Sequence, residues 1–176
     1  TCMIQLCKFR GAHSIAVSSS MAKLETCKEI GAFCGVNYRQ IPNYSERVKL
    51  ITDSDGVDLI LDPILGSFFQ ENLECLGMDA RWVIYGAMGG VKVKEANMMK
   101  LMGKRASILT STLRNRDDTY KSELVADMAK ECMPAFEDGR LRPIIDKVYS
   151  MRSAREALER MSENLNVGKI VMKNDL

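Results

Sequence analysis

Short apolar runs alternate with stretches of helical periodicity along most of the chain. The apolar runs predict strands at Ser14–Ser18, Phe33–Tyr38, Val57–Leu61, Arg81–Tyr85, Ala106–Thr112, Ile144–Ser150 and Gly168–Lys173. Between them, apolar spacings of three and four residues predict helices at Thr1–Arg10, Met21–Ile30, Ala96–Met102 and Tyr120–Met133, and further helices through Val48, Leu73 and Ala157. Regular alternation with short connections is typical of parallel βαβ units. We therefore expect an α/β fold built on a Rossmann-type, doubly wound parallel sheet.

Several predicted helices carry residues that favour a helix end. Glycines at C′ positions are expected to follow helices at Gly11, Gly31 and Gly77, and Pro134 is expected to stop the helix before it. Capping-box pairs at Asn43 with Glu46, Ser67 with Gln70, and Ser153 with Glu156 predict three helix starts. Inward-facing side chains are expected at Leu124, Val125, Met128, Cys132, Ala157, Leu158 and Met161.

The turn after the Ser14–Ser18 strand has an unusual polar composition. In dinucleotide-binding folds this strand usually ends in a carboxylate that binds the adenosine ribose hydroxyls. Here Ser19, Ser20 and Lys23 stand in that region, and no carboxylate appears before Glu25. Hydroxyls and an ammonium favour a phosphate on the ribose, which a carboxylate would repel. The turn predicts an NADP-type site, with an ordinary serine N-cap and a solvated lysine as the alternative.

Two later strands also end in candidate ligand-binding turns. The carboxyl ends of parallel strands share one edge of a sheet, where doubly wound folds bind their ligands. We therefore expect the Ser18–Ser20, Asp62–Gly66 and Gly86–Gly90 turns to lie on one rim. Glycine after a strand allows close approach of a ligand, although it also simply permits a tight turn.

Composition narrows the class of protein. The chain has 176 residues, enough for one domain or slightly more, and its 46% hydrophobic and 27% charged residues are typical of a globular protein. A net charge of +2 without a long basic run argues against a nucleic-acid surface. No apolar run approaches the roughly 18 residues of a membrane span, and no signal peptide is recognised. We expect a cytoplasmic location.

The cysteine and histidine content offers little material for a metal site. Six cysteines occur without a CxxC pair, so we expect reduced and mostly buried thiols. His13 is the single histidine, which leaves neither a metal centre nor a histidine-based catalytic triad.

Several motifs then point to one family. They are Asn37-Tyr38-Arg39, Gly56-Val57-Asp58 with Asp62, Asp79–Val83 leading into Tyr85-Gly86, and Asn166–Val171. In order and spacing they resemble the zinc-free quinone oxidoreductases, the zeta-crystallin-like branch of the medium-chain dehydrogenase/reductase superfamily. The segment Ile108–Asp117 is similar to the stress-inducible animal members of that branch. The resemblance extends from Thr1 to Lys173.

The resemblance implies where NADPH would bind. It places Ser19, Ser20 and Lys23 at the 2′-phosphate and Tyr38 at the phosphoadenosine end. It also places Gly86, Ala87, Met88, Ser111, Thr112 and Leu113 near the nicotinamide half. Asn164 matches a position at which some relatives carry a phosphate- or nicotinamide-side arginine.

The resemblance also implies a division of the chain. Residues 1–140 correspond to an NADP-binding Rossmann domain, and residues 141–176 to a segment that packs on a GroES-like catalytic domain. The family's glycine-rich loop and its strand would precede Thr1, and the chain does not begin with Met, so we expect a fragment whose natural start lies upstream. Without the catalytic domain, apolar surface around Met3, Ile4 and Ile170 is expected to be uncovered.

The implied activity is hydride transfer from NADPH to a quinone or a similar α,β-unsaturated carbonyl. No catalytic acid or base is assigned: Asp62 before Pro63 is interpreted as a turn residue and Arg116 as a solvated loop charge. The strand at Ala106–Thr112 is a candidate edge, which in relatives pairs across a homodimer two-fold axis.

Other functions stay open at this point. One is an enoyl-thioester reductase of the same superfamily. Another is a non-catalytic module that binds nucleotide or self-associates. A methyltransferase-like fold is disfavoured, because the second strand lacks the ribose-binding acid.

Overall fold

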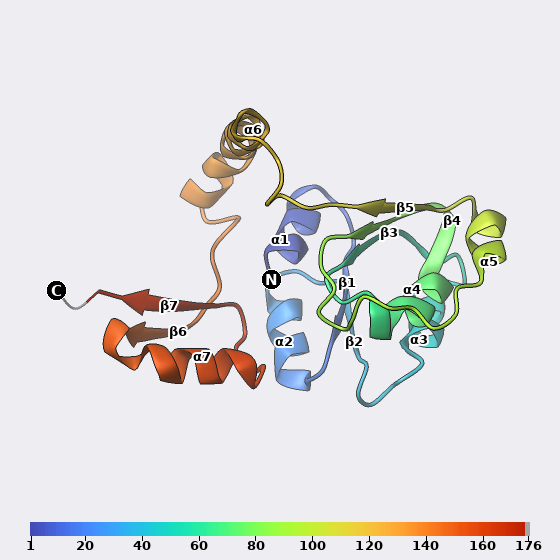
Figure 1. The fold of residues 1–176 in the computed structure, drawn as a ribbon, viewed down its shortest axis with the longest axis horizontal. Coiled ribbons are helices and arrows are strands. Elements are labelled where there is room, and N and C mark those ends of the chain that lie inside the picture. The colour runs from blue at the N-terminus through green and yellow to red at the C-terminus, as the bar shows by residue number, and fades with distance from the viewer. Residues whose placement is uncertain (175–176) are drawn as a thin grey trace. The chain divides into compact units, whose positions relative to one another are not determined.

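The computed structural model describes residues 1–174, and Figure 1 follows their helices and strands along the chain. The chain divides into two compact units. One contains Thr1–Gly35 and the chain from Ala126 onward, and the other is Val36–Val125. The strand pairs of both units are parallel, so the expected α/β class is confirmed.

The unit at Val36–Val125 is built on a three-stranded sheet. Its strands are β3 (Val57–Asp62), β4 (Leu76–Ile84) and β5 (Ser107–Thr110), in the order β3-β4-β5. The helices are α3 (Tyr44–Ile51), α4 (Phe69–Cys75) and α5 (Met98–Lys104), with a 3₁₀ turn, η1 (Gly66–Phe68), before α4. Side chains of α4, α5 and β4 form the core, which consists of Phe69, Leu73, Leu76, Ala80, Trp82 and Leu101. Trp82 is completely buried, which makes it a large contributor of apolar area.

Strand β4 begins earlier than predicted. Val57 pairs with Leu76 and Leu59 with Arg81, so the intervening residues of β4 bulge out of the ladder. Gly56 lies against this bulge: a Cβ on Gly56 would come 2.6 Å from the amide nitrogen of Gly77. Gly77 follows Leu76, the C-cap residue of α4, as predicted, but it belongs to β4 and lacks the positive φ of a left-handed C′ glycine. Its lack of a side chain permits the close backbone contact between β3 and β4.

The three capping boxes do not form. Asn43, Phe68 and Ser153 occupy the N-cap positions of α3, α4 and α7 (Ala154–Ser162), and none accepts a side-chain capping bond. Other groups take over this role, because Glu71 of α4 accepts a 2.8 Å hydrogen bond from the Ser45 amide in the first turn of α3. Before α4, a 3₁₀ turn shifts the helix start one residue past the predicted Ser67, whereas Ser153 occupies the predicted N-cap position of α7.

The other unit contains α1 (Cys2–Phe9), β1 (Ile15–Ser18), α2 (Met21–Glu29), α7, and the parallel pair β6 (Ile145–Ser150) and β7 (Lys169–Lys173). β1 forms a two-stranded sheet with β2 (Cys34–Asn37), at which the two units divide. The predicted glycine ends of α1 and α2 are confirmed: Gly11 and Gly31 both adopt positive φ, at 71° and 110°.

Helix α6 (Asp118–Glu137) continues past Pro134, so the predicted stop is wrong. Cys132 and Ala135 lie on either side of the proline and pack with Leu141, supported by Leu6 and Phe9 of α1. This packing outweighs the hydrogen bond that a proline removes from a helix.

The expected inward faces of α6 and α7 are only partly correct. Cys132 and Ala157 are buried, whereas the remaining predicted side chains are exposed: Leu124, Val125, Met128, Leu158 and Met161. Helical periodicity identified the apolar stripe but not whether another element covers it.

Two expectations from composition can also be compared with the structure. All six cysteines are free, but only Cys75 and Cys132 are buried, so the expectation of mostly buried thiols is wrong. Within residues 1–174, no helix has the length and apolarity needed to cross a membrane.

Candidate functional site

The predicted cofactor residues fall into two groups, one in each unit. The first group is Ser19, Ser20, Lys23 and Asn164, and the second is Tyr38, Gly86, Ala87, Met88, Ser111, Thr112 and Leu113. Each group is described within its own unit.

Ser20 begins helix α2. Its Oγ accepts a 3.2 Å hydrogen bond from the Lys23 amide, so the predicted serine N-cap is confirmed. Ser19 is half-buried beside it at the end of β1. The capping hydrogen bond uses the Lys23 backbone and leaves the direction of its side chain to be set by other contacts.

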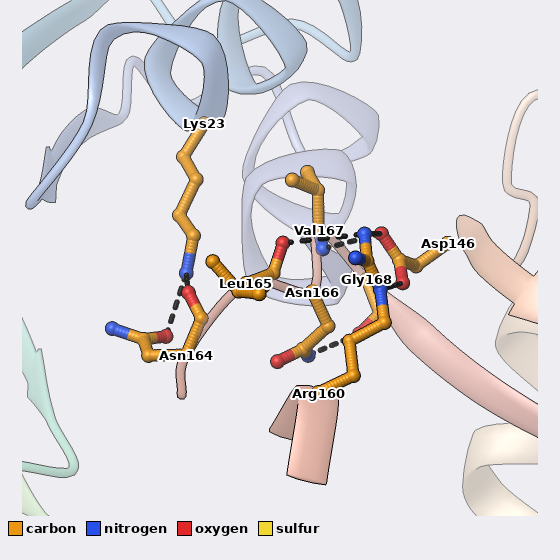
Figure 2. Close-up of polar contacts among 8 residues, drawn as sticks. All are labelled: Lys23, Asp146, Arg160, Asn164, Leu165, Asn166, Val167 and Gly168. Carbon is orange, nitrogen blue, oxygen red and sulfur yellow. Dashed lines mark hydrogen bonds and ion pairs between the residues drawn. The ribbon is translucent and has the colours of Figure 1, made fainter. Parts of the chain in front are cut away.

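The Lys23 side chain reaches Asn164, 141 residues away in sequence (Figure 2). Its Nζ donates to the backbone oxygen and to Oδ1 of Asn164, at 2.6 Å each. The structure thus brings together two predicted site residues that lie on separate elements. Both contacts are hydrogen bonds to neutral oxygens, so neither adds a negative charge beside the ammonium.

Asn164 occupies the left-handed C′ position after α7, with φ 56°. The Asn164 amide donates to Met161 O at 3.0 Å, and the Leu165 amide donates to Arg160 O at 3.2 Å. This pattern is a Schellman motif, in which asparagine is one of the few residues that tolerate the backbone conformation.

Asp146 and Arg160 form the main ion pair next to this turn. Arg160 Nε and Nη2 donate to the two carboxylate oxygens of Asp146 at 2.6 and 2.9 Å, and the Val167 amide donates to Oδ1 at 3.0 Å. The Asp146 side chain is only 7% exposed. Hydrogen bonding from Arg160 holds the pKa of the Asp146 carboxyl at about 2.

In the other unit, a buried carboxylate controls the turn after β3. Asp62 is 2% exposed, and its Oδ1 accepts from the amides of Ile64 and Leu65 at 2.7 and 3.0 Å. Its Oδ2 accepts from Asn72 Nδ2 and Trp82 Nε1, both at 3.0 Å. The sequence interpretation of Asp62 as a turn residue is correct, but it missed the buried partners on α4 and β4.

A tyrosine extends this network. The Tyr44 hydroxyl donates to Asn72 Oδ1 at 2.9 Å. Burial raises the pKa of Tyr44, so its hydroxyl stays neutral and remains a donor. This orientation of the Asn72 amide directs its NH₂ group at Asp62.

The turns after β3 and β4, residues 62–67 and 86–90, bind each other through their backbones; we call them the rim loops. Met88 N donates to Pro63 O at 3.0 Å, and Gly66 N donates to Gly90 O at 2.9 Å. A Cβ on Gly86 would lie 2.8 Å from Pro63 O. Glycine at this position is therefore explained by contact between the loops. Ala87 is half-buried and Met88 is exposed.

The segment after β5 lies beside the second rim loop. Ser111 N donates to Ile84 O at 2.9 Å at the end of β4. Since β4 and β5 are parallel neighbours, the Gly86–Met88 and Ser111–Leu113 segments share one edge of the sheet. A groove of about 470 Å³ follows there, lined by Thr110, Ser111, Thr112, Asn115 and Arg116.

Two further side chains can be compared with their interpretations. Tyr38 packs edge-on against Phe68, with 5.0 Å between ring centroids, which matches the alternative of a tyrosine packing at a strand end. Arg116 is exposed, as expected, but its guanidinium lies 4.6 Å from the centroid of the Tyr120 ring.

Side chains that could bind a metal do not cluster in the part of the chain that the structure describes. Among residues 1–174, no three side chains of His, Cys, Asp or Glu gather into a possible metal site. Burial raises the pKa of the Cys75 thiol to about 12, which keeps it protonated and unreactive.

Comparisons with known proteins come from both sequence and structure. The family model described as "Zinc-binding dehydrogenase" matches residues 1–130. A synaptic vesicle membrane protein VAT-1 homolog of Danio rerio is 25% identical, with 97% of this chain covering 38% of that protein. A 2-haloacrylate reductase of Burkholderia sp is 27% identical (97% of this chain, 50% of that protein), and quinone oxidoreductase-like protein 2 of Bos taurus is 25% identical (92% and 45%).

Solved structures of two oxidoreductases superpose closely on this chain. An NAD-dependent alcohol dehydrogenase superposes with a TM-score of 0.81 at 26% identity, over 97% of this chain and 46% of that one. The quinone oxidoreductase of Thermus thermophilus, solved also with NADPH, has a TM-score of 0.81 at 24% identity, over 98% of this chain and 53% of that one. The chain spans about half, or less, of the length of the proteins it matches.

We expect Asp62→Asn to lower the free energy of unfolding by about 2–4 kcal/mol, because the new NH₂ group faces two donors in either orientation. Urea unfolding followed by fluorescence of the single tryptophan measures this change. Asp58→Asn, on the exposed side of the same strand, is the matched control and should change the value by less than about 0.5 kcal/mol. Equal changes in the free energy of unfolding for the two substitutions would contradict a stabilising role of the Asp62 hydrogen bonds.

The Asp146–Arg160 pair predicts a pH dependence. Since the pKa of Asp146 is about 2 in the folded chain and ~3.9 when unfolded, its stabilisation is present above pH 4 and is lost as the pH falls toward 2. The difference in unfolding free energy between wild type and Asp146→Asn should shrink by roughly 1–2 kcal/mol over that interval. A difference that stays constant between pH 5 and pH 2 would contradict this prediction.

Proposed function

The chain belongs to the zinc-binding dehydrogenase family, within the medium-chain dehydrogenase/reductase superfamily, and on that premise we propose that it is the cofactor-binding part of an NADPH-dependent reductase. Its mixed α/β fold with parallel strands is that of the NAD(P)-binding, Rossmann-like domain of these enzymes. Division of the chain at residue 140 stays part of this proposal.

The Lys23 ammonium is the observation that carries the choice of NADPH. Two neutral oxygens of Asn164 bind it, and Lys23 itself lies in the first turn of α2, whose N-cap is Ser20, the residue after Ser19. Residues 18–22 contain no carboxylate that would bind ribose hydroxyls and repel a 2′-phosphate. We assign these four residues to the phosphate end of the cofactor.

The remaining site residues are assigned to the other parts of the cofactor. Tyr38 is proposed at the phosphoadenosine end. The exposed residues Ser111, Thr112 and Leu113, with Gly86, Ala87 and Met88 at the same edge of the sheet, are proposed beside the nicotinamide. Bound NADPH supplies a hydride, and the task of these residues is to bind and orient the cofactor.

A quinone or a similar α,β-unsaturated carbonyl is the proposed acceptor. Relatives named quinone oxidoreductase-like protein 2 and 2-haloacrylate reductase support it, because both names describe reduction of a conjugated, electron-poor acceptor. An enoyl-thioester reductase is the runner-up for the same reason. A fragment that only binds nucleotide or self-associates is a second alternative.

The family's name raises the question of zinc. The side chains of residues 1–174 do not fit a zinc site, because no group of three ligands occurs among them. We therefore assign no step to a metal and no catalytic acid or base to these residues. A cytoplasmic location is proposed as well, since the six cysteines are free thiols.

A homodimer is proposed through strand β5, the core of the predicted Ala106–Thr112 edge. β5 pairs with β4 on one side and lies at the edge of its three-stranded sheet. Leu109 on this strand is 47% exposed, which provides an apolar contact for a second copy.

Calorimetric titration with NADPH and NADH tests the cofactor assignment. Wild type should prefer NADPH, and Lys23→Ala should lower NADPH affinity about 10- to 100-fold, because a charge-assisted contact to phosphate is lost. NADH affinity should change less than about two-fold. Lys28→Ala, on an exposed position of the same helix, is the control. Equal affinity for both cofactors in wild type would contradict the proposal.

Sedimentation velocity tests the dimer. Leu109→Lys should raise the dimer dissociation constant at least about ten-fold, because two lysines would meet across the paired edges. Leu50→Lys, which also replaces an exposed leucine but on α3, should leave it unchanged. A wild-type chain that is monomeric at all concentrations would rule the dimer out.

A further inference from the structure

The turn at residues 163–168, between α7 and β7, is held by the Asp146–Arg160 pair at more than one point (Figure 2). The Val167 amide donates to Asp146 Oδ1 at 3.0 Å, and Arg160 Nη2 lies 3.5 Å from the Leu165 oxygen. Both carboxylate oxygens of Asp146 are also bound by the guanidinium. The pair therefore fixes the backbone on the C-terminal side of Asn164.

The N-terminal side of Asn164 is fixed by the helix. Amides of Asn164 and Leu165 close the Schellman motif on the oxygens of Met161 and Arg160, at 3.0 and 3.2 Å. Asn164 is thus held between the last turn of α7 and the ion pair. Its backbone oxygen has little freedom to move independently of Asp146 and Arg160, and its Oδ1 is bound to Lys23.

The group that these oxygens hold is intrinsically mobile. A lysine side chain has four rotatable bonds, and ordering it costs free energy that otherwise has to come from ligand binding. Here Nζ is already bound by both oxygens of Asn164, so part of that cost is met before any ligand arrives. Because these two oxygens are neutral, neither adds a negative charge beside the ammonium.

We propose that Asp146 and Arg160 are positioning residues that set cofactor preference: they fix the 163–168 turn, and through Asn164 they place the Lys23 ammonium for a 2′-phosphate. This inference rests on the proposed NADPH site. It adds two residues that neither touch the cofactor nor lie near Lys23 in sequence.

The test compares Arg160→Met with Arg155→Met in calorimetric titrations of the full chain. Arg155 lies on the same helix and makes an exposed ion pair with Glu159, so its loss should change neither affinity. Arg160→Met should weaken NADPH binding roughly 3- to 10-fold and leave NADH binding within about two-fold. A purely structural defect would lower both affinities together.

Coupling to Lys23 provides the second part of the test. In the double variant with Lys23→Ala, Arg160→Met should cause no further loss of NADPH affinity, because the ammonium that it positions is gone. Independent, additive losses would overturn the inference.

Two substitutions at Asn164 keep the inference testable if Arg160→Met does not fold. Asn164→Gly retains the left-handed turn but removes Oδ1, and should weaken NADPH binding a few-fold without affecting NADH. Asn164→Asp also tolerates the turn but neutralises Lys23, and should abolish the preference for NADPH. Unchanged preference in both variants would overturn the inference.

Failure of the inference can be separated from failure of the proposed function. If wild type prefers NADPH and Lys23→Ala loses that preference while Arg160→Met keeps it, only the positioning role is wrong. If wild type binds neither cofactor, or both equally, the proposed site and the positioning role are overturned together.

Discussion

The unit at Val36–Val125 depends on a carboxylate that is satisfied entirely by protein donors. Asp62 ends β3 with its side chain 2% exposed, where an unpaired charge would be too costly to keep. Two backbone amides and two side-chain donors remove that cost. These donors come from the first rim loop, α4 and β4. The amides shape the first rim loop, Asn72 anchors α4, and Trp82 anchors β4. Because the first rim loop binds the second through backbone hydrogen bonds, the geometry of the Gly86–Met88 backbone follows from a group that it does not touch.

In the other unit, a buried carboxylate is stabilised by an ion pair. Asp146 is 7% exposed and accepts from Arg160 and from the Val167 amide, so it too orders the backbone of a loop next to a strand. The two carboxylates differ in their counter-charges. Asp62 is stabilised by neutral donors inside a hydrophobic core, whereas Asp146 has a guanidinium that is itself partly in water. The pair therefore avoids the full desolvation penalty of a buried ion pair and still fixes the turn.

Structural features that depend on residues close together in sequence could be predicted. Most strand positions and the glycine ends of α1 and α2 follow from patterning and backbone preference and are confirmed, although β4 begins earlier than predicted. Two of the failures involve partners distant in sequence. Glu71, from another helix, takes over capping of α3, and packing around Cys132 and Ala135 carries α6 through Pro134. At the candidate site, Ser20 was identifiable because a cap is local. The contact between Lys23 and Asn164 spans 141 residues and was not predicted. Family resemblance indicated Asn164 only as a site residue, while Asp146 and Arg160 carried no recognisable signal.

Asn164 both adopts a left-handed backbone conformation and binds the Lys23 ammonium. The left-handed position after α7 favours Gly, Asn or Asp. Glycine would offer Lys23 only a backbone oxygen, and aspartate would neutralise it. Asparagine supplies two neutral oxygens, which bind the lysine without adding a negative charge. The left-handed conformation does not by itself exclude arginine, because Arg105 adopts it after α5 with φ 50°. An arginine at position 164 would add a second positive charge, and its side chain could accept no hydrogen bond from Lys23. Backbone conformation and hydrogen-bonding capacity together thus favour asparagine beside the proposed phosphate site.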